Sequence, residues 1–205
     1  MFAQVRKIKK VIIPDTVTSI GAEAFWGCSD LTKIKIPNSV TSIGDGGHWG
    51  VFSDCSFLTN INIPEGVTTI YSKTFEGCSS LTSIKIPNSV TSIGTAAFNG
   101  CSSLTNINIP DNVTYIDSYA FCGCSSLTSI NIPRGVTNIG DFAFRSCSKI
   151  TSINIPISVT SIGYRAFLDF TSSQTINIEA SEKPSGWNSG WNGFCNAKIN
   201  WGVSM

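Results

Sequence analysis

The chain has 205 residues, a formal net charge of +1 and only 13% charged residues. This balance argues against nucleic acid as a partner, because binding to phosphates needs a basic surface. The hydrophobic content of 41% is enough to bury a continuous core, yet no apolar run approaches the roughly 20 residues of a membrane-spanning helix. We therefore expect no membrane insertion.

The first ten residues, MFAQVRKIKK, are charged and lack an apolar stretch after the charges, so we predict no signal peptide. Seven prolines then recur at steps of 23, 27, 23, 23, 23 and 23 residues, and an eighth step falls on Glu179. A fixed period of this length is typical of a solenoid. We predict about eight 23-residue coils over residues 1–178, with residues 1–14 as a partial first coil. The prolines are Pro14, Pro37, Pro64, Pro87, Pro110, Pro133 and Pro156.

Each unit contains the same three predicted elements. An Ile-x-Ile segment that stops at proline predicts a short strand, since proline cannot donate to a strand ladder. Val-Thr-Ser-Ile-Gly predicts a second, shorter strand, and Ala-Phe-x-Gly-Cys predicts a tight turn with a left-handed residue in the glycine slot. One coil buries too little to fold alone, so the coils must stack. The glycine slot holds Gly27, Asp54, Gly77, Gly100, Gly123, Ser146 and Asp169. The predicted fold class is mainly β, with parallel short strands and little helix.

Two further columns are predicted to face inward. One consists of seven phenylalanines, which we expect to stack as a single internal column. The other consists of six cysteines, for which a buried file of small side chains is the main interpretation. Disulfides between coils and a soft-metal array are the alternatives, although a tetrahedral site needs converging ligands. The columns are Phe25, Phe52, Phe75, Phe98, Phe121, Phe144 and Phe167, and Cys28, Cys55, Cys78, Cys101, Cys124 and Cys147.

The second unit carries the chain's one insertion, four residues within 45–50, and this insertion contains the single histidine. Insertions in repeats map to loops, often on a binding face. We therefore predict His48 and Trp49 as candidate contacts, with a neutral insertion as the alternative. Asp45 lies near His48, but no motif places a nucleophile. The sequence predicts no catalytic residues, no metal site and no cofactor.

The outward positions of the Ile-x-Ile strands grade from basic to asparagine-rich. A flat face of amides, hydroxyls and lysines would suit hydrogen bonding to an extended peptide or a glycan. The alternative is a solvated sheet face without a ligand. The candidate binding residues on this face are Lys33, Lys35, Asn62, Lys85, Asn108, Asn131, Asn154 and Asn177.

The period stops after Ile178, and residues 179–205 are rich in tryptophan and glycine. A final coil needs a cover with a polar outside. We predict a C-terminal cap in which aromatic side chains plug the open core, with exposed tryptophans for sugar stacking as the alternative. These side chains are Trp187, Trp191, Phe194 and Trp201.

Residues 8–178 resemble a known family. Leu81-x-x-Ile84-x-Ile86 matches the leucine-rich-repeat pattern L-x-x-L-x-L. The following asparagine or cysteine slot differs, since Ser89 occupies it here. The combination of Ile-Pro, V-x-x-I-G and A-F-x-G-C resembles BspA-like leucine-rich repeats. The resemblance implies a curved β-solenoid used for adhesion or protein binding at the surface of bacteria and some protists, and it supplies no catalytic residues.

Three functions remain open from the sequence. The leading hypothesis is a recognition module for a protein or extracellular-matrix partner. The second is a glycan-binding module that uses the asparagines and the C-terminal tryptophans, and the third is a purely structural or assembling repeat protein. The resemblance implies a cell-surface or secreted location, whereas the missing signal peptide makes the cytoplasm the alternative.

Overall fold

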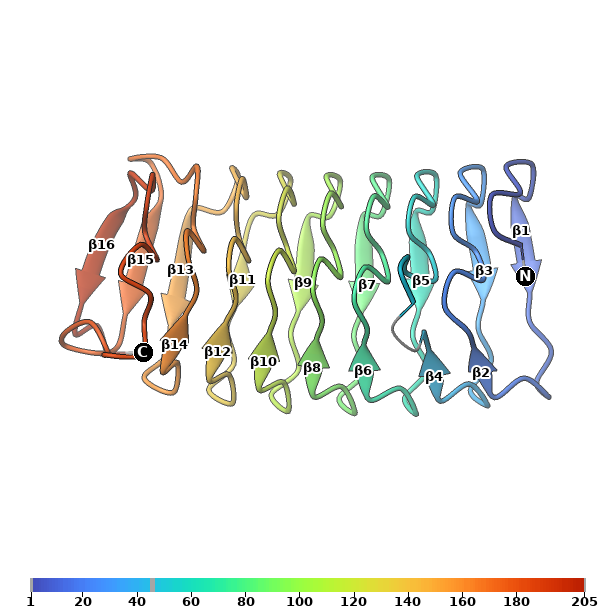
Figure 1. Cartoon of the computed structure of the whole chain (residues 1–205), viewed down its shortest axis with the longest axis horizontal. Coiled ribbons are helices and arrows are strands. Elements are labelled where there is room, and N and C mark those ends of the chain that lie inside the picture. The colour runs from blue at the N-terminus through green and yellow to red at the C-terminus, as the bar shows by residue number, and fades with distance from the viewer. Residues whose placement is uncertain (1, 45–46, 205) are drawn as a thin grey trace.

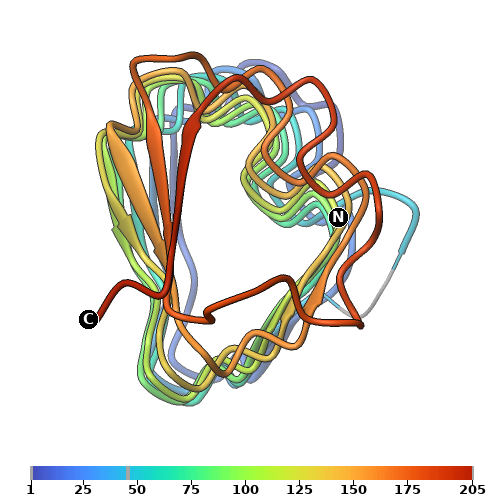
Figure 2. The ribbon, with the colours of Figure 1, turned by 90° about the vertical axis from the view of Figure 1, so that its left-hand side faces the viewer.

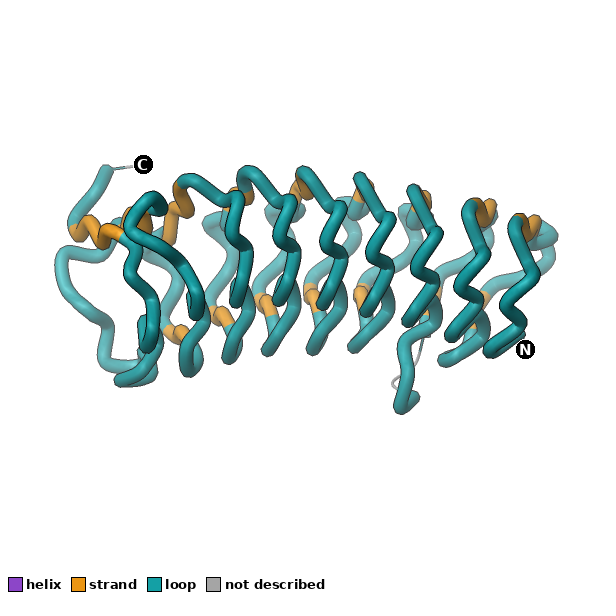
Figure 3. The backbone as a smooth tube through the Cα atoms, turned by 90° about the horizontal axis from the view of Figure 1, so that it is seen from above, coloured by secondary structure: helices purple, strands orange, loops and turns teal. Residues whose placement is uncertain are grey.

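The computed structural model describes residues 2–44 and 47–204, which form a solenoid of coils stacked along one axis (Figure 1). The two termini lie at opposite ends of the stack. The described residues contain parallel strands and turns but no helix, and the strands occupy short stretches of each coil (Figure 3). This architecture of about eight turns of roughly 23 residues confirms the predicted fold class.

The strands form two series along the stack. The long series is β1 (Lys10–Ile12), β3 (Lys33–Lys35), β5 (Asn60–Asn62), β7 (Ser83–Lys85), β9 (Asn106–Asn108), β11 (Ile130–Asn131), β13 (Ser152–Ile155), β15 (Thr175–Ile178) and β16 (Lys198–Trp201). The short series is β2 (Ser19–Ile20), β4 (Ser42–Ile43), β6 (Thr69–Ile70), β8 (Ser92–Ile93), β10 (Tyr115–Ile116), β12 (Asn138–Ile139) and β14 (Ser161–Ile162). Neighbours pair in parallel, so Ile84 lies opposite Ile107. Both ladders break at the 27-residue step, between β3 and β5 and between β4 and β6, and the long ladder is also divided between β9 and β11, where a single bridge joins Asn106 and Ser129.

The phenylalanine column forms the centre of the core. All seven predicted rings are at most 4% exposed. Consecutive rings stack with centroids 5.4–5.7 Å apart and interplanar angles of 4–12°. The predicted internal stack is therefore confirmed. Phe2 extends it by one ring, 5.6 Å from Phe25, a member that sequence reasoning missed because it precedes the first proline.

The six predicted cysteines form a buried file beside this stack. Each thiol donates a hydrogen bond to the carbonyl of a phenylalanine in the preceding coil, as Cys101 Sγ does to Phe75 O at 3.1 Å. Burial raises the pKa of every thiol in the file. The file therefore consists of neutral thiols that act as small hydrogen-bond donors.

Two columns of left-handed residues shape the turn of each coil. All seven residues of the predicted glycine slot have φ between 58° and 73°, Ser146 included. A second column lies two residues before six of the seven phenylalanines, Phe52 being the exception, and has φ between 51° and 60°: Glu23, Lys73, Ala96, Tyr119, Phe142 and Arg165. Sequence reasoning missed it because none of these residues is glycine. Bonds between coils hold this backbone, such as the Ala96 N–H to Ser118 O at 2.9 Å.

The C-terminal segment forms a further turn of the solenoid. Strand β16 pairs in parallel with β15, and Asn200 lies opposite Asn177. Trp187 and Trp191 are each 3% exposed, and Trp191 meets the Phe167 ring edge-on at 5.9 Å. These two tryptophans plug the core as predicted, whereas Trp201 is 37% exposed and Phe194 is 72% exposed. The division into a solenoid and a cap at residue 178 stays a prediction.

Candidate functional site

The outward side chains of the long series form one continuous surface, which we call the strand face. Successive strands lie about 4.8 Å apart, so equivalent side chains form two files along the stack. The side chains from β1 to β13 are exposed, and those of β15 are half-buried. The strand face therefore gathers eight of the ten predicted site residues: Lys33, Lys35, Asn62, Lys85, Asn108, Asn131, Asn154 and Asn177.

Cations concentrate at the N-terminal end of the strand face. Lys10 lies directly opposite Lys33 in the β1–β3 register, an arrangement of like charges that destabilises a sheet. Among the described residues, no carboxylate forms an ion pair with Lys10, Lys33 or Lys35. Lys85 differs, because its Nζ lies 3.0 Å from Glu65 Oε1. Among the described residues, the ammonium groups of Lys10, Lys33 and Lys35 are thus not neutralised by a carboxylate.

Amides dominate the C-terminal end of the strand face. The side-chain amide of Asn200 donates to Asn177 Oδ1 at 2.9 Å, and that of Asn177 donates to Asn154 Oδ1 at 3.0 Å. This ladder orients three side chains relative to one another. A shallow depression lies beside it at the carboxyl ends of β11 and β13, lined in part by Asn131, Asn154 and Arg134.

The His48–Trp49 loop lies on the other side of the solenoid from the strand face (Figure 2). Trp49 stacks on Trp26 with centroids 5.1 Å apart, and the Lys73 ammonium lies 4.8 Å from the centre of its ring. Lys73 Nζ also donates to His48 O at 3.2 Å. These contacts hold His48 and Trp49 in place, but the two residues do not lie beside the predicted lysines and asparagines of the strand face. Asp45 lies outside the described residues.

A family profile described as a BspA type leucine rich repeat region, in six copies, matches residues 1–102 and 49–177. The chain belongs to the BspA-type leucine-rich repeat family. No curated protein matches the chain. The family assignment agrees with the resemblance seen in the sequence and covers both the cationic and the amide-rich parts of the strand face.

Solved structures of leucine-rich repeat proteins resemble this BspA-type chain. A protein from Bacteroides ovatus is 31% identical with a TM-score of 0.83, over 98% of this chain and 51% of its own. One from T. pallidum is 30% identical with a TM-score of 0.69, and the match covers 78% of this chain and 75% of the T. pallidum chain. A leucine rich cell surface protein from Faecalibacterium prausnitzii is 28% identical with a TM-score of 0.56, and the match covers 100% of this chain and 65% of the F. prausnitzii chain. The chain spans about half the length of the B. ovatus protein.

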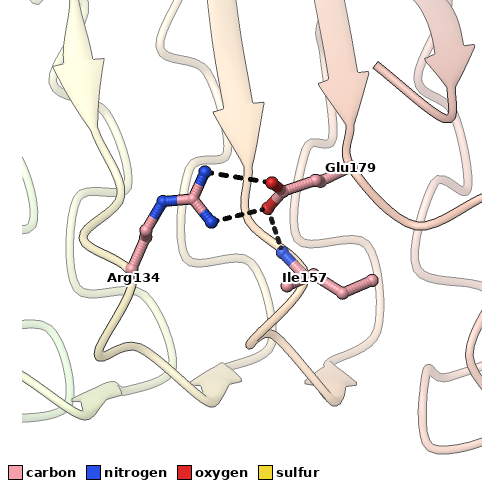
Figure 4. A network of polar contacts seen from close by, with 3 residues as sticks. All are labelled: Arg134, Ile157 and Glu179. Carbon is pink, nitrogen blue, oxygen red and sulfur yellow. Dashed lines mark hydrogen bonds and ion pairs between the residues drawn. The ribbon is translucent and has the colours of Figure 1, made fainter. Parts of the chain in front are cut away.

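A polar clamp joins three successive coils of this BspA-type solenoid (Figure 4). Glu179 occupies the slot that proline fills elsewhere. Its carboxylate accepts the Ile157 N–H at 2.8 Å and two Arg134 N–H groups at 3.0 and 3.3 Å. The Ile157 hydrogen bond, followed by the Arg134 interaction, lowers the pKa of Glu179. Sequence reasoning noted the exchange of proline for Glu179 but not this role.

The contribution of Glu179 to the stability of the fold is expected to depend on pH. Its folded-state pKa is lowered, so its contribution is present above its ordinary pKa of about 4.3 and is lost as pH falls through the folded value. We expect Glu179→Gln to lower the Tm at about pH 6 and to lower it by less at about pH 2.5. Calorimetry at both pH values measures this, and an equal loss at both would contradict it.

One cluster of aromatic side chains, on the turns that follow the short strands, was not predicted from the sequence. Tyr119 and Phe142 stack with ring centroids 4.9 Å apart, and Phe142 meets Tyr164 edge-on at 5.7 Å. Arg165 extends this row beside Phe194. The 23-residue period places Tyr119, Phe142 and Arg165 in one column, but that column begins with Glu23 and Lys73 and has no common chemistry to mark it.

The described residues hold no group of three or more His, Cys, Asp or Glu side chains that would bind a metal ion. Within residues 2–44 and 47–204, no helix is long and apolar enough to cross a bilayer. Both the assigned family and the similar solved structures are leucine-rich repeat proteins.

Proposed function

We propose that the chain is a non-enzymatic recognition module that binds a protein or extracellular-matrix partner through the strand face. The observation that carries the proposal is the contrast between the two sides of the long strands. The inward positions are isoleucine in strand after strand, whereas the outward positions change from Lys33 and Lys35 to Asn154 and Asn177. Packing in the core accounts for the constant inward isoleucines, and binding of a ligand would account for the change from lysine to asparagine at the outward positions.

The charge gradient assigns a role to each half of the strand face. Unpaired lysines at one end would steer and hold an acidic region of the partner. The amides at the other end would hydrogen-bond to its backbone or polar side chains. We also propose a cell-surface location, which rests on the name of the 28% identical F. prausnitzii protein.

Reversing three charges tests the strand face. Lys33, Lys35 and Lys85 are exposed, so we expect the triple change to Glu to weaken binding at least tenfold without lowering the Tm, since rim charges act on binding and not on the core. Binding is measured by surface plasmon resonance against a panel of immobilised extracellular-matrix proteins. A charge-matched control changes Lys7, Lys149 and Lys183 to Glu, outside the strand face. Equal binding by the test variant and the wild-type chain would show that another surface binds.

The glycan hypothesis loses part of its basis. Trp187 and Trp191 are buried, so they are not available to stack on a sugar. The amide ladder of Asn154, Asn177 and Asn200 remains as a polar surface, and a glycan array without hits would remove this alternative. The assembling-protein hypothesis requires self-association, which light scattering measures.

A further inference from the structure

A second surface lies across the solenoid from the strand face, on the turns that follow β10, β12 and β14 (Figure 2). We call it the aromatic cluster. Tyr119, Phe142, Tyr164 and Arg165 lie on these turns, and Phe194 joins them from the segment between β15 and β16. Tyr164 is 37% exposed and Phe194 is 72% exposed. Exposed large aromatic side chains beside an arginine are the residue types that dominate binding energy at protein interfaces.

Arg165 is held between two rings of this cluster. The centre of its guanidinium lies 4.6 Å from the Tyr164 ring centroid and 4.4 Å from that of Phe194. Its backbone is also fixed, because its N–H donates to Gly190 O at 2.9 Å. A planar guanidinium held by aromatic rings keeps its N–H donors in a defined orientation.

Two glycines of the last coil, Gly190 and Gly193, pack directly against Tyr164 and Arg165. A Cβ at Gly190 would lie 2.8 Å from two carbon atoms of the Tyr164 ring. A Cβ at Gly193 would lie 3.3 Å from Arg165 Cγ. A side chain at either position would push on Tyr164 or Arg165, so the two glycines leave room for the present packing of the cluster.

The guanidinium N–H donors of Arg165 have no acceptor within residues 2–44 and 47–204, where this group makes ring contacts alone. The neighbouring carboxylates are engaged elsewhere. Asp141 Oδ1 accepts the Tyr164 N–H at 2.6 Å, and Asp169 Oδ2 accepts from Ser146 Oγ at 2.6 Å and from Arg145 Nε at 3.5 Å. An oriented guanidinium of this kind matches the two oxygens of a carboxylate.

We propose that the aromatic cluster docks a protein segment that places an Asp or Glu carboxylate on Arg165 and an apolar side chain against Phe194. Charge complementarity selects the carboxylate. Asp141 and Asp169 both bond to residues of the cluster, Asp141 to the Tyr164 N–H and Asp169 through its own N–H to Phe194 O. Their negative charge opposes a dianionic phosphate more strongly than a singly charged carboxylate. The site is separate from the strand face and uses none of its residues.

The test selects binders from a displayed library of random linear peptides on the whole folded chain. Recovered peptides are synthesised, and their affinities are measured for the wild-type chain and for Arg165→Gln, Arg165→Lys and Phe194→Ala. We expect peptides that contain Asp or Glu to lose at least tenfold in affinity with each variant. Glutamine removes the positive charge, lysine lacks the planar guanidinium that binds both oxygens of a carboxylate, and Phe194→Ala removes the apolar contact. The matched control is Arg145→Gln, an exposed arginine already paired with Asp169, which should change affinity less than twofold.

Three results would overturn the proposal. The first is the absence of any recovered peptide whose binding depends on Arg165. The second is full binding after the acidic residue of a recovered peptide is changed to its amide. The third is loss of binding in the Lys33, Lys35 and Lys85 triple variant, which would place the peptides on the strand face. Unchanged melting temperatures for all variants exclude unfolding as the cause of any loss.

Discussion

Replacement of Phe98 by alanine is expected to lower the free energy of unfolding by about 3–5 kcal/mol. Phe98 is 0% exposed, and its ring stacks on Phe75 and Phe121 with both centroid distances at 5.4 Å. The substitution leaves a cavity in the middle of a column that neighbouring coils cannot fill without shifting. Urea unfolding followed by circular dichroism measures the loss.

Phe57→Ala is the matched control, because its side chain is 59% exposed. An exposed site of this kind usually changes stability by no more than about 0.5 kcal/mol. If Phe98→Ala cost no more than Phe57→Ala, the phenylalanine column would not be the close-packed element that holds the coils together.

Gly50→Ala should also destabilise the chain strongly, by about 3 kcal/mol. A Cβ at this position would lie 1.8 Å from Lys73 O, 2.1 Å from Lys73 C and 2.6 Å from Thr74 N. These atoms belong to the backbone of the next coil, so they cannot rotate away as a flexible side chain would. The coils must separate locally, which strains the Phe52 N–H to Thr74 O bond of 3.0 Å.

Gly21→Ala provides the comparison for this prediction. A Cβ at Gly21 would meet nothing within 4 Å, so we expect a change near zero or a small gain from reduced freedom of the unfolded chain. Thermal unfolding of the two variants side by side measures the difference. Equal melting temperatures would mean that the close approach at Gly50 is not maintained in solution.

The core was predictable because each of its columns repeats one residue type. Phe98 and Cys101 belong to such columns, and stacking follows directly from their 23-residue period. The second left-handed column was not predictable, since residues as different as Ala96 and Arg165 occupy it. Their backbone is imposed by hydrogen bonds from the next coil, and such tertiary bonds override local propensity.

Surface sites were predictable only within a column. The strand face followed from alternation along each strand, which places Lys33 and Lys35 on the same side. The Glu179 clamp and the contact of Arg165 with Phe194 join different columns, so the repeat period did not reveal them. The Tyr119–Phe142 stack lies within one column, but that column has no common residue type to mark it. The final turn was missed for a related reason, because Trp201 replaces the isoleucine that would have continued the pattern.

The Glu179 clamp also changes how the C-terminal end of the molecule comes apart. In a stack where every turn touches only its neighbours, the outermost layers detach one at a time. The carboxylate of Glu179 reaches past the adjacent layer to Arg134, 45 positions earlier in the chain. Loss of the layer that carries Glu179 therefore also removes a bond from a layer two steps further inside, and we expect the three layers that the clamp joins to open more cooperatively than layers elsewhere.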